Sequence, residues 1–258
     1  AFSGADRLVP SAELQAQVNE AIGQSYRIDQ IKLLATKVTT YLRSQGFLLA
    51  QAYLPQQDVS KGELEIAIID GRLEGTKDNI IEVVAEDLRL KPEIIQKTAA
   101  RRLSSDAPVK TKDLERILLI INDLPGVSAK ATLKPGSKPG TTRIVTSVKE
   151  GEQFSGVAWY DNYGSRYSGR STFNAQLNIN DPLRIGDKIT GTVSAAADQW
   201  NVSVRYSMPF LYDGIRINAG ANLLDYAIGK ELASSEAEGH ATTFNLGINY
   251  PLIRSRAK

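Results

Sequence analysis

The residue types that most often carry out catalysis are scarce in this sequence. Its 258 residues include no cysteine, which excludes disulfides, thiolate zinc sites and cysteine nucleophiles. A catalytic triad or a histidine metal site would depend on one side chain, His240, which lies between Gly239 and Ala241. Glu63 and Glu65 share one face of an expected strand, but glycosidase chemistry also needs a cleft. We interpret this pair as part of a solvated face and expect no enzyme activity.

Charge and hydropathy argue against two further classes of protein. Lys and Arg number 31 and Asp and Glu number 29, so the formal net charge is only +2 and gives no strong electrostatic case for binding nucleic acid. No apolar run approaches the roughly 20 residues that a membrane-spanning helix needs. The sequence therefore does not predict a nucleic-acid-binding protein or a helical membrane protein.

The spacing of apolar residues changes at about residue 150, and this change is the best domain boundary in the sequence. Before it, helical and strand spacing both occur, which is typical of small mixed α and β units. The order helix, helix, strand, strand is expected twice, and we treat the second set as a structural repeat of the first. The expected helices are 11–22, 29–45, 91–103 and 111–123, and the expected strands are 47–54, 63–69, 127–133 and 142–148.

From Phe154 onward, six segments alternate between an apolar or small face and a polar face. In 171–180, for example, Phe173 and Leu177 share one face, and Asn174 and Asn178 share the other. Tilted transmembrane β-strands of about 9 to 11 residues alternate in this way between lipid and a wet lumen. Candidate residues of a pore lumen are Asn174, Gln176, Asn178, Lys188, Arg205 and Arg216.

The same alternation occurs in soluble β-sandwiches, but aromatic residues near the strand ends favour a membrane barrel, which places girdles there. These aromatic residues are Trp159, Tyr160, Trp200, Tyr206, Phe210, Tyr226 and Tyr250. Six strands are fewer than the roughly eight of the smallest single-chain membrane barrels, and an open edge in lipid leaves backbone groups unpaired. We therefore expect the chain to be a fragment of a longer barrel protein.

Several stretches resemble one known family. YLRSQGFLLAQAYLPQQDVSKGELEIAIIDGRLEG is similar to the first polypeptide-transport-associated (POTRA) domain of two-partner secretion transporters, and LERILLIINDLPGVSAKATLKPGSKPGTT is similar to their second. WYDNYGSRYSGR, NDPLRIGDKIT, VRYSMPFLYDG and NYPLIRSR resemble the opening barrel strands of the same haemolysin secretion/activation family. Together these stretches span nearly the whole chain, although the family's arginine-containing lid-loop motif has no counterpart in it.

The resemblance implies α+β POTRA domains followed by antiparallel transmembrane β-barrel strands, here an incomplete part of a barrel of about 16 strands. The expected parts are 1–72, a first POTRA domain without its first strand; 73–150, a second POTRA domain; and 151–258, the first six barrel strands. The implied protein lies in the bacterial outer membrane with its POTRA domains in the periplasm. It captures an unfolded exported partner polypeptide and translocates it to the cell surface.

The implied partners are the secreted polypeptide and outer-membrane lipid, and no nucleic acid, cofactor or enzyme activity is implied. The full-length protein is expected to be monomeric. Client contact is expected at POTRA sheet edges, where an extended peptide can add as a strand. The candidate residues are Leu48, Ala50, Gln51, Tyr53, Val127, Ala129, Ala131 and Leu133.

Two other functions stay open. A related outer-membrane assembly factor would insert barrels instead of exporting a client, and such proteins usually carry more POTRA domains. A soluble binding protein with two small α/β modules and a β-sandwich would need no detergent. Membrane partitioning separates this last alternative from the other two.

Overall fold

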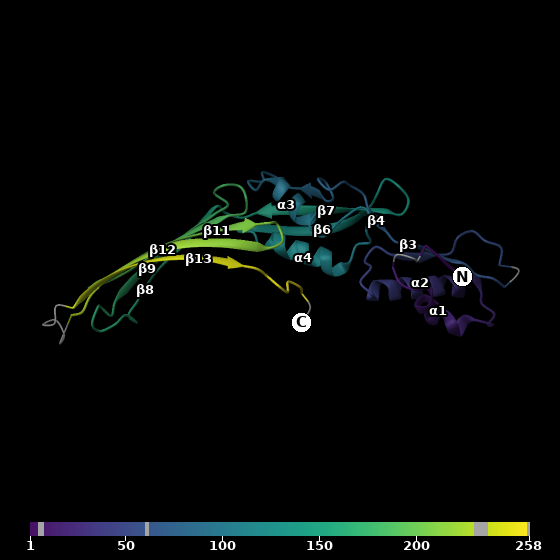
Figure 1. Ribbon diagram of the computed structural model, residues 1–258, viewed down its shortest axis with the longest axis horizontal. Coiled ribbons are helices and arrows are strands. Elements are labelled where there is room, and N and C mark those ends of the chain that lie inside the picture. The colour runs from purple at the N-terminus through teal and green to yellow at the C-terminus, as the bar shows by residue number, and fades with distance from the viewer. Residues whose placement is uncertain (5–7, 60–61, 230–236, 257–258) are drawn as a thin grey trace.

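The computed structural model describes residues 1–4, 8–59, 62–229 and 237–256. It is elongated, with two α/β units followed by a long curved sheet (Figure 1). We call strands β1 to β3 with their helices the first unit, β4 to β7 with their helices the second unit, and β8 to β13 the strand sheet. In the part of the chain that the model describes, no helix is both long enough and apolar enough to cross a membrane.

The first unit packs two helices against a three-stranded sheet with strand order β1-β3-β2. β1 runs parallel to β3, and β2 runs antiparallel to it. Leu14 and Leu42 of the helices lie fully buried against Ile68 of the sheet. The elements are β1 (Phe2–Ser3), α1 (Ser11–Val18), a short 3-10 helix (Asn19–Ala21), α2 (Ile28–Ser44), β2 (Gln51–Tyr53) and β3 (Ile66–Ile69).

The second unit is built around β7, which pairs antiparallel with β6 along its length and parallel with β4 and β5. Leu114, Ile117 and Ile121 recur at helical spacing along α4, so they form one stripe that is buried in the core. The elements are β4 (Arg72–Leu73), β5 (Glu82–Val84), α3 (Pro92–Ala99), α4 (Thr111–Asn122), β6 (Val127–Pro135) and β7 (Thr141–Glu150).

The two units meet where the end of α2 approaches the start of α4. The Leu48 N–H donates to the Val109 carbonyl at 3.1 Å, the Thr111 N–H donates to the Gly46 carbonyl at 2.9 Å, and Phe47 forms an isolated bridge with Lys110. The strand expected over 47–54 is therefore shortened to β2, because its first residues pair with the second unit.

Three short strands differ from the expectation. No strand is expected before the first helix, yet Phe2–Ser3 forms β1, and β4 and β5 are also absent from the predicted elements. These strands have two or three residues each, too few for a period-2 pattern. Their extended conformation is instead stabilised by pairing with the longer β3 and β7.

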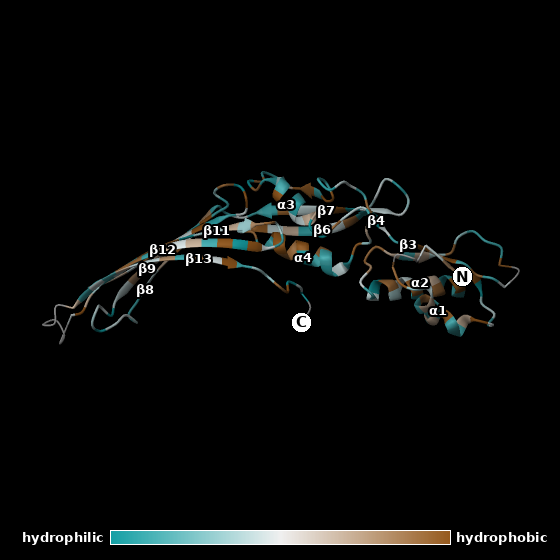
Figure 2. Cartoon of the chain, in the orientation of Figure 1, coloured by the Kyte–Doolittle hydropathy of each residue, from teal (hydrophilic) through white to brown (hydrophobic). Residues whose placement is uncertain are grey.

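The strand sheet pairs each of its six strands antiparallel with the next, in the order β13-β12-β11-β10-β9-β8. Figure 2 shows hydrophobic and hydrophilic residues alternating along these strands. Apolar side chains on one face are highly exposed, with Phe244 and Leu246 each 79% exposed. The strands are β8 (Phe154–Asp161), β9 (Thr172–Asn180), β10 (Lys188–Ala196), β11 (Gln199–Phe210), β12 (Ile215–Ala227) and β13 (Glu238–Asn249).

Candidate functional site

The register of the strand sheet places all six candidate lumen residues on one face. Directly paired residues of antiparallel strands lie on the same face. Asn174, Gln176 and Asn178 alternate along β9, and Asn178 pairs with Thr190, which in turn pairs with Arg205. The remaining pairs that connect this face are Asn180 with Lys188, Lys188 with Ser207, Ser207 with Asn218, and Pro209 with Arg216.

Uncharged polar side chains form hydrogen bonds across this polar face. The Gln176 amide donates to Asn178 Oδ1 at 3.3 Å, and the Thr190 hydroxyl donates to the same oxygen at 3.0 Å. The hydroxyls of Thr192 and Ser203 are 2.6 Å apart. The face is therefore suited to contact with water or with a polar polypeptide, whereas the opposite face is suited to lipid.

The three cations of this set have different surroundings. Arg216 Nε donates to Ser207 Oγ at 2.9 Å, and its Nη1 and Nη2 lie 3.3 Å from the Gly186 carbonyl oxygen. It therefore braces the β9–β10 connection. The side chains of Lys188 and Arg205 make no hydrogen bond or ion pair with any described residue, so their charges stay available on the polar face.

Trp159 also lies on the polar face, because it pairs with Asn174. Its neighbour Tyr160 pairs with Phe173 and lies on the apolar face. The sequence pattern placed both aromatic residues in the expected girdle and did not distinguish the faces on which they lie. Asp161 lies two residues after Trp159 and therefore on the same face, where it accepts a hydrogen bond from the Asn174 amide at 3.0 Å. This polar residue was the sequence signal that could have shown which face of β8 is polar.

The candidate client-contact residues of the first unit are only partly accessible. β2 lies at the edge of its sheet, and the side chains of Gln51 and Tyr53 are exposed. Ala50 is fully buried, and Leu48 packs against the core of the second unit. A peptide added at this edge would therefore contact the β2 backbone and only two of the four proposed side chains.

In the second unit, β6 pairs with β7 on one side, and no other described strand pairs with it. Val127 and Ala129 point into the core, Ala131 is half-buried, and Leu133 is 40% exposed. Of these four candidates only Leu133 is exposed, and the accessible part of this edge is its backbone together with outward side chains such as that of Lys130.

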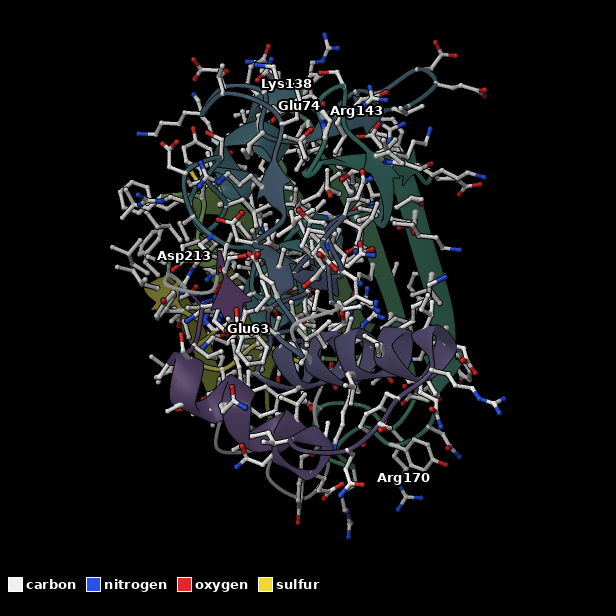
Figure 3. The ribbon with its side chains drawn as sticks, turned by 90° about the vertical axis from the view of Figure 1, so that its right-hand side faces the viewer. Glu63, Glu74, Lys138, Arg143, Arg170 and Asp213 are labelled. Atoms are coloured by element: carbon white, nitrogen blue, oxygen red, sulfur yellow. The ribbon has the colours of Figure 1, made fainter. Side chains whose placement is uncertain are left out.

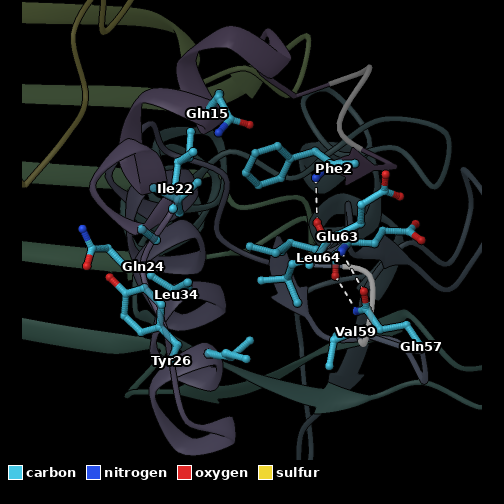
Figure 4. A pocket seen from close by; sticks show the side chains of 18 of the residues that line it. Phe2, Gln15, Ile22, Gln24, Tyr26, Leu34, Gln57, Val59, Glu63 and Leu64 are labelled. Atoms are coloured by element: carbon cyan, nitrogen blue, oxygen red, sulfur yellow. Dashed lines mark hydrogen bonds between the residues drawn. The ribbon is translucent and has the colours of Figure 1, made fainter.

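An open hollow of about 1010 Å³ lies beside the first unit (Figure 4). Its lining combines apolar side chains such as Ile22 and Leu34 with amides such as Gln15. Gln57 holds one wall, because its amide donates to the Glu65 carbonyl at 2.8 Å and its Oε1 accepts from the Glu65 N–H at 2.7 Å. Sequence reasoning missed this hollow, because its lining comes from separate helix, loop and strand segments.

The loop between β6 and β7 is fixed by Glu74. The carboxylate accepts hydrogen bonds from the Ser137 hydroxyl and from the Ser137 N–H, the latter at 2.8 Å. These bonds, with the charges of Arg143 and Lys138, hold the pKa of Glu74 below its ordinary value. Figure 3 shows Glu74, Lys138 and Arg143 on the same side of the molecule.

The β9–β10 connection contacts the second unit through backbone and ionic groups. The Arg184 guanidinium donates to the Arg89 carbonyl at 2.7 Å, and the Lys91 N–H donates to the Arg184 carbonyl at 3.1 Å. Glu150, at the end of β7, accepts from the Arg89 and Leu90 N–H groups at 2.7 and 3.0 Å. The bonds of Arg184 join the second unit to the β9–β10 connection, and the bonds of Glu150 hold the Arg89–Leu90 segment in place within the second unit.

Two aspartates inside that connection are almost completely buried. Asp181 Oδ1 accepts from the Gly186 N–H at 2.6 Å, whereas its Oδ2 has no hydrogen-bond partner. Asp187 accepts from the Leu183 N–H at 3.1 Å and from the Tyr206 hydroxyl at 2.9 Å. Burial is the main cause that raises the pKa of Asp181 above its ordinary value.

Comparison with family models gives two matches along the chain. A model described as "POTRA domain, ShlB-type" matches residues 1–71. A model described as "Haemolysin secretion/activation protein ShlB/FhaC/HecB" matches residues 140–258. Together the matched segments cover most of the chain.

The chain is also similar to curated transporters. It is 27% identical over 252 residues to the heme/hemopexin transporter protein HuxB of Haemophilus influenzae, covering 96% of this chain and 43% of HuxB. It is 24% identical over 262 residues to the outer membrane transporter CdiB of Escherichia coli, covering 98% of this chain and 42% of that protein. The chain thus spans less than half the length of these relatives.

Solved structures share the fold. CdiB from Escherichia coli superposes with a TM-score of 0.74 at 23% identity, over 99% of this chain and 47% of that one. BamA from Haemophilus ducreyi lacking POTRA domains 1–3 superposes with a TM-score of 0.54 at 16% identity, over 93% of this chain and 46% of that one. These matches confirm the expected fold class, and the two family models confirm the resemblance of the chain to the haemolysin secretion/activation family, whose own model matches residues 140–258.

Proposed function

We propose that the chain is part of an outer-membrane pore that captures an unfolded exported polypeptide in the periplasm and passes it to the cell surface by two-partner (type V) secretion. The observation that carries this proposal is a sheet with one exposed apolar face and one polar face, joined directly to two α/β units with open strand edges. The transporter names of the relatives HuxB and CdiB support it.

The three parts take different tasks in this proposal. Residues 1–72 and 73–150 are the two POTRA domains, and 151–258 are barrel strands with their apolar face in outer-membrane lipid. The pore is lined by Asn174, Gln176, Asn178, Lys188 and Arg205. Arg216 lines the periplasmic end of the pore and also holds the β9–β10 connection through the Gly186 carbonyl. The protein acts as a monomer and needs no cofactor or catalytic residue.

Client contact is assigned mainly to backbone groups at two strand edges. An extended peptide that adds to β2 would contact Gln51 and Tyr53, and one that adds to β6 would contact Leu133. The other candidate side chains pack in the cores of the two units and stabilise these edge strands without touching the client. They are those of Leu48, Ala50, Val127, Ala129 and Ala131. Because backbone bonding is indifferent to sequence, these edges suit an unfolded client.

Comparative proteomics of the culture medium tests this function. A strain lacking the gene should lose at least one exported polypeptide from its medium and regain it when the gene is restored. The abundance of other outer-membrane barrel proteins should not change. An unchanged medium together with depleted barrel proteins would contradict export and favour the barrel-assembly alternative.

A further inference from the structure

The connection between β11 and β12 has a strained backbone and contacts the second unit. Leu211 and Tyr212 both have φ of 57°, a left-handed conformation that is unfavourable for residues other than glycine. Arg101 Nε donates to the Leu211 carbonyl at 2.9 Å, and Lys97 Nζ lies 5.3 Å from the centre of the Tyr212 ring. Contacts from α3 and the turn that follows it therefore help to hold this conformation.

Asp213, the next residue, is shared by several groups. It lies 3.4 Å from Arg102 Nη2 and 3.6 Å from Arg116 Nε, and it accepts a hydrogen bond from the Tyr250 hydroxyl at 2.9 Å. Tyr250 directly follows β13, whereas Asp213 precedes β12. The carboxylate thus joins the β11–β12 connection and the segment after β13 to Arg116 of α4 and to Arg102, which follows α3.

Arg116 of α4 is the only cation among the described residues that is buried, with 8% of its surface exposed. Its Nη2 donates to the Pro251 carbonyl at 2.8 Å, and its guanidinium lies 5.7 Å from the centre of the Tyr250 ring. A buried guanidinium is costly unless its surroundings compensate for lost hydration. Here the compensating groups come mostly from the strand sheet and not from the unit that carries Arg116.

Further contacts continue along α4. Arg254 forms two hydrogen bonds with Asp123, at 2.6 and 2.9 Å, and the Arg256 N–H donates to Glu115 at 2.7 Å. The segment after β13 therefore follows the surface of α4. These contacts are exposed, unlike those of Arg116, and exposed ion pairs contribute little to stability.

We propose that Arg116 is a positioning residue that fixes the second unit against the β11–β12 connection and the segment after β13, and so sets the direction in which this unit faces the polar side of the sheet. It contacts no client in this role. The contacts define the orientation of the unit independently of function, and only the consequence for client delivery rests on the proposed function.

Distance measurement between two spin labels tests the proposal. This chain has no native cysteine, so Lys130→Cys on exposed β6 and Val204→Cys on the apolar face of β11 add two labelling sites, and any cysteine elsewhere in the whole protein is first replaced by serine. The whole protein, purified in detergent, should give one narrow distance peak. Arg116→Gln and Asp213→Ala should each lose this narrow peak while the circular dichroism of the protein is kept.

Arg102→Ala is the matched control, because Arg102 also contacts Asp213 but is far more exposed. It should keep the narrow peak. A narrow peak in both Arg116→Gln and Asp213→Ala would overturn the proposal, and so would loss of the peak in Arg102→Ala. If Arg116→Gln does not fold, Asp213→Ala alone decides, because its side chain lies in a connection outside the core. Export by the unsubstituted protein tests the proposed function separately.

Discussion

At the scale of single residues, Asp181 is held where its charged form is poorly accommodated. It is 1% exposed, has φ of 56°, and leaves Oδ2 without a hydrogen bond. Asparagine adopts this backbone conformation readily and carries no charge. We expect Asp181→Asn to stabilise the protein at pH 7 by about 1 kcal/mol, because it removes the buried charge and keeps an oxygen that can accept from the Gly186 N–H.

The pH dependence of this effect follows from the raised pKa of Asp181. Ionisation of a group whose pKa is raised by folding destabilises the fold as pH increases through that pKa. The gain from Asp181→Asn should therefore be largest at neutral pH and shrink in acid, as measured by thermal unfolding from pH 7 to pH 4. Asp181→Ala is the control and should destabilise, because it also loses the bond from the Gly186 N–H.

Asp213 should respond to pH in the opposite sense. Burial disfavours its charge, but hydrogen bonds from Tyr250 and Arg102 and the charge of Arg116 outweigh burial, so the pKa of Asp213 lies below its ordinary value. Its contribution is present above the ordinary pKa of about 3.9 and is lost as pH falls through the lower folded value. Docking of the second unit, followed by the same spin labels, should loosen below about pH 4. Asp213→Asn should be loosened already at pH 7 and show little further change.

At the scale of elements, the two faces of β13 should tolerate charge differently. Leu246 lies on the exposed apolar face, and Asn245 lies on the polar face opposite Gly220. A charged side chain in the lipid midplane costs about 2 to 4 kcal/mol. Leu246→Arg should therefore lower the yield of heat-modifiable protein in outer-membrane fractions, whereas Asn245→Arg should not. Equal yields would contradict the assignment of the apolar face to lipid.

Elements with long periodic patterns could be predicted from the sequence, and short ones could not. α4 and the strands from β9 onward carry enough repeats for the period to be unambiguous, and the register then fixes which residues share a face. β5 has three residues and depends on pairing with β7. Leu48 was assigned to an edge because local sequence could not show that it packs against the second unit.

At the scale of the whole molecule, the contacts between parts were the least predictable. Arg116 lies on a helix whose pattern indicates only a buried stripe, and its partners are more than 90 residues away in sequence. The hollow beside the first unit likewise gathers distant segments. Such sites depend on how units dock, and periodicity within one segment carries no information about docking.

The proposed function requires that the strand sheet belong to a pore in the outer membrane. Planar-bilayer recording with the purified, detergent-extracted whole protein tests it most directly, after the protein is recovered by membrane fractionation. We predict recovery in the outer-membrane fraction and discrete conductance steps. Recovery in the water-soluble fraction without any conductance would contradict the account and favour a binding protein with a β-sandwich.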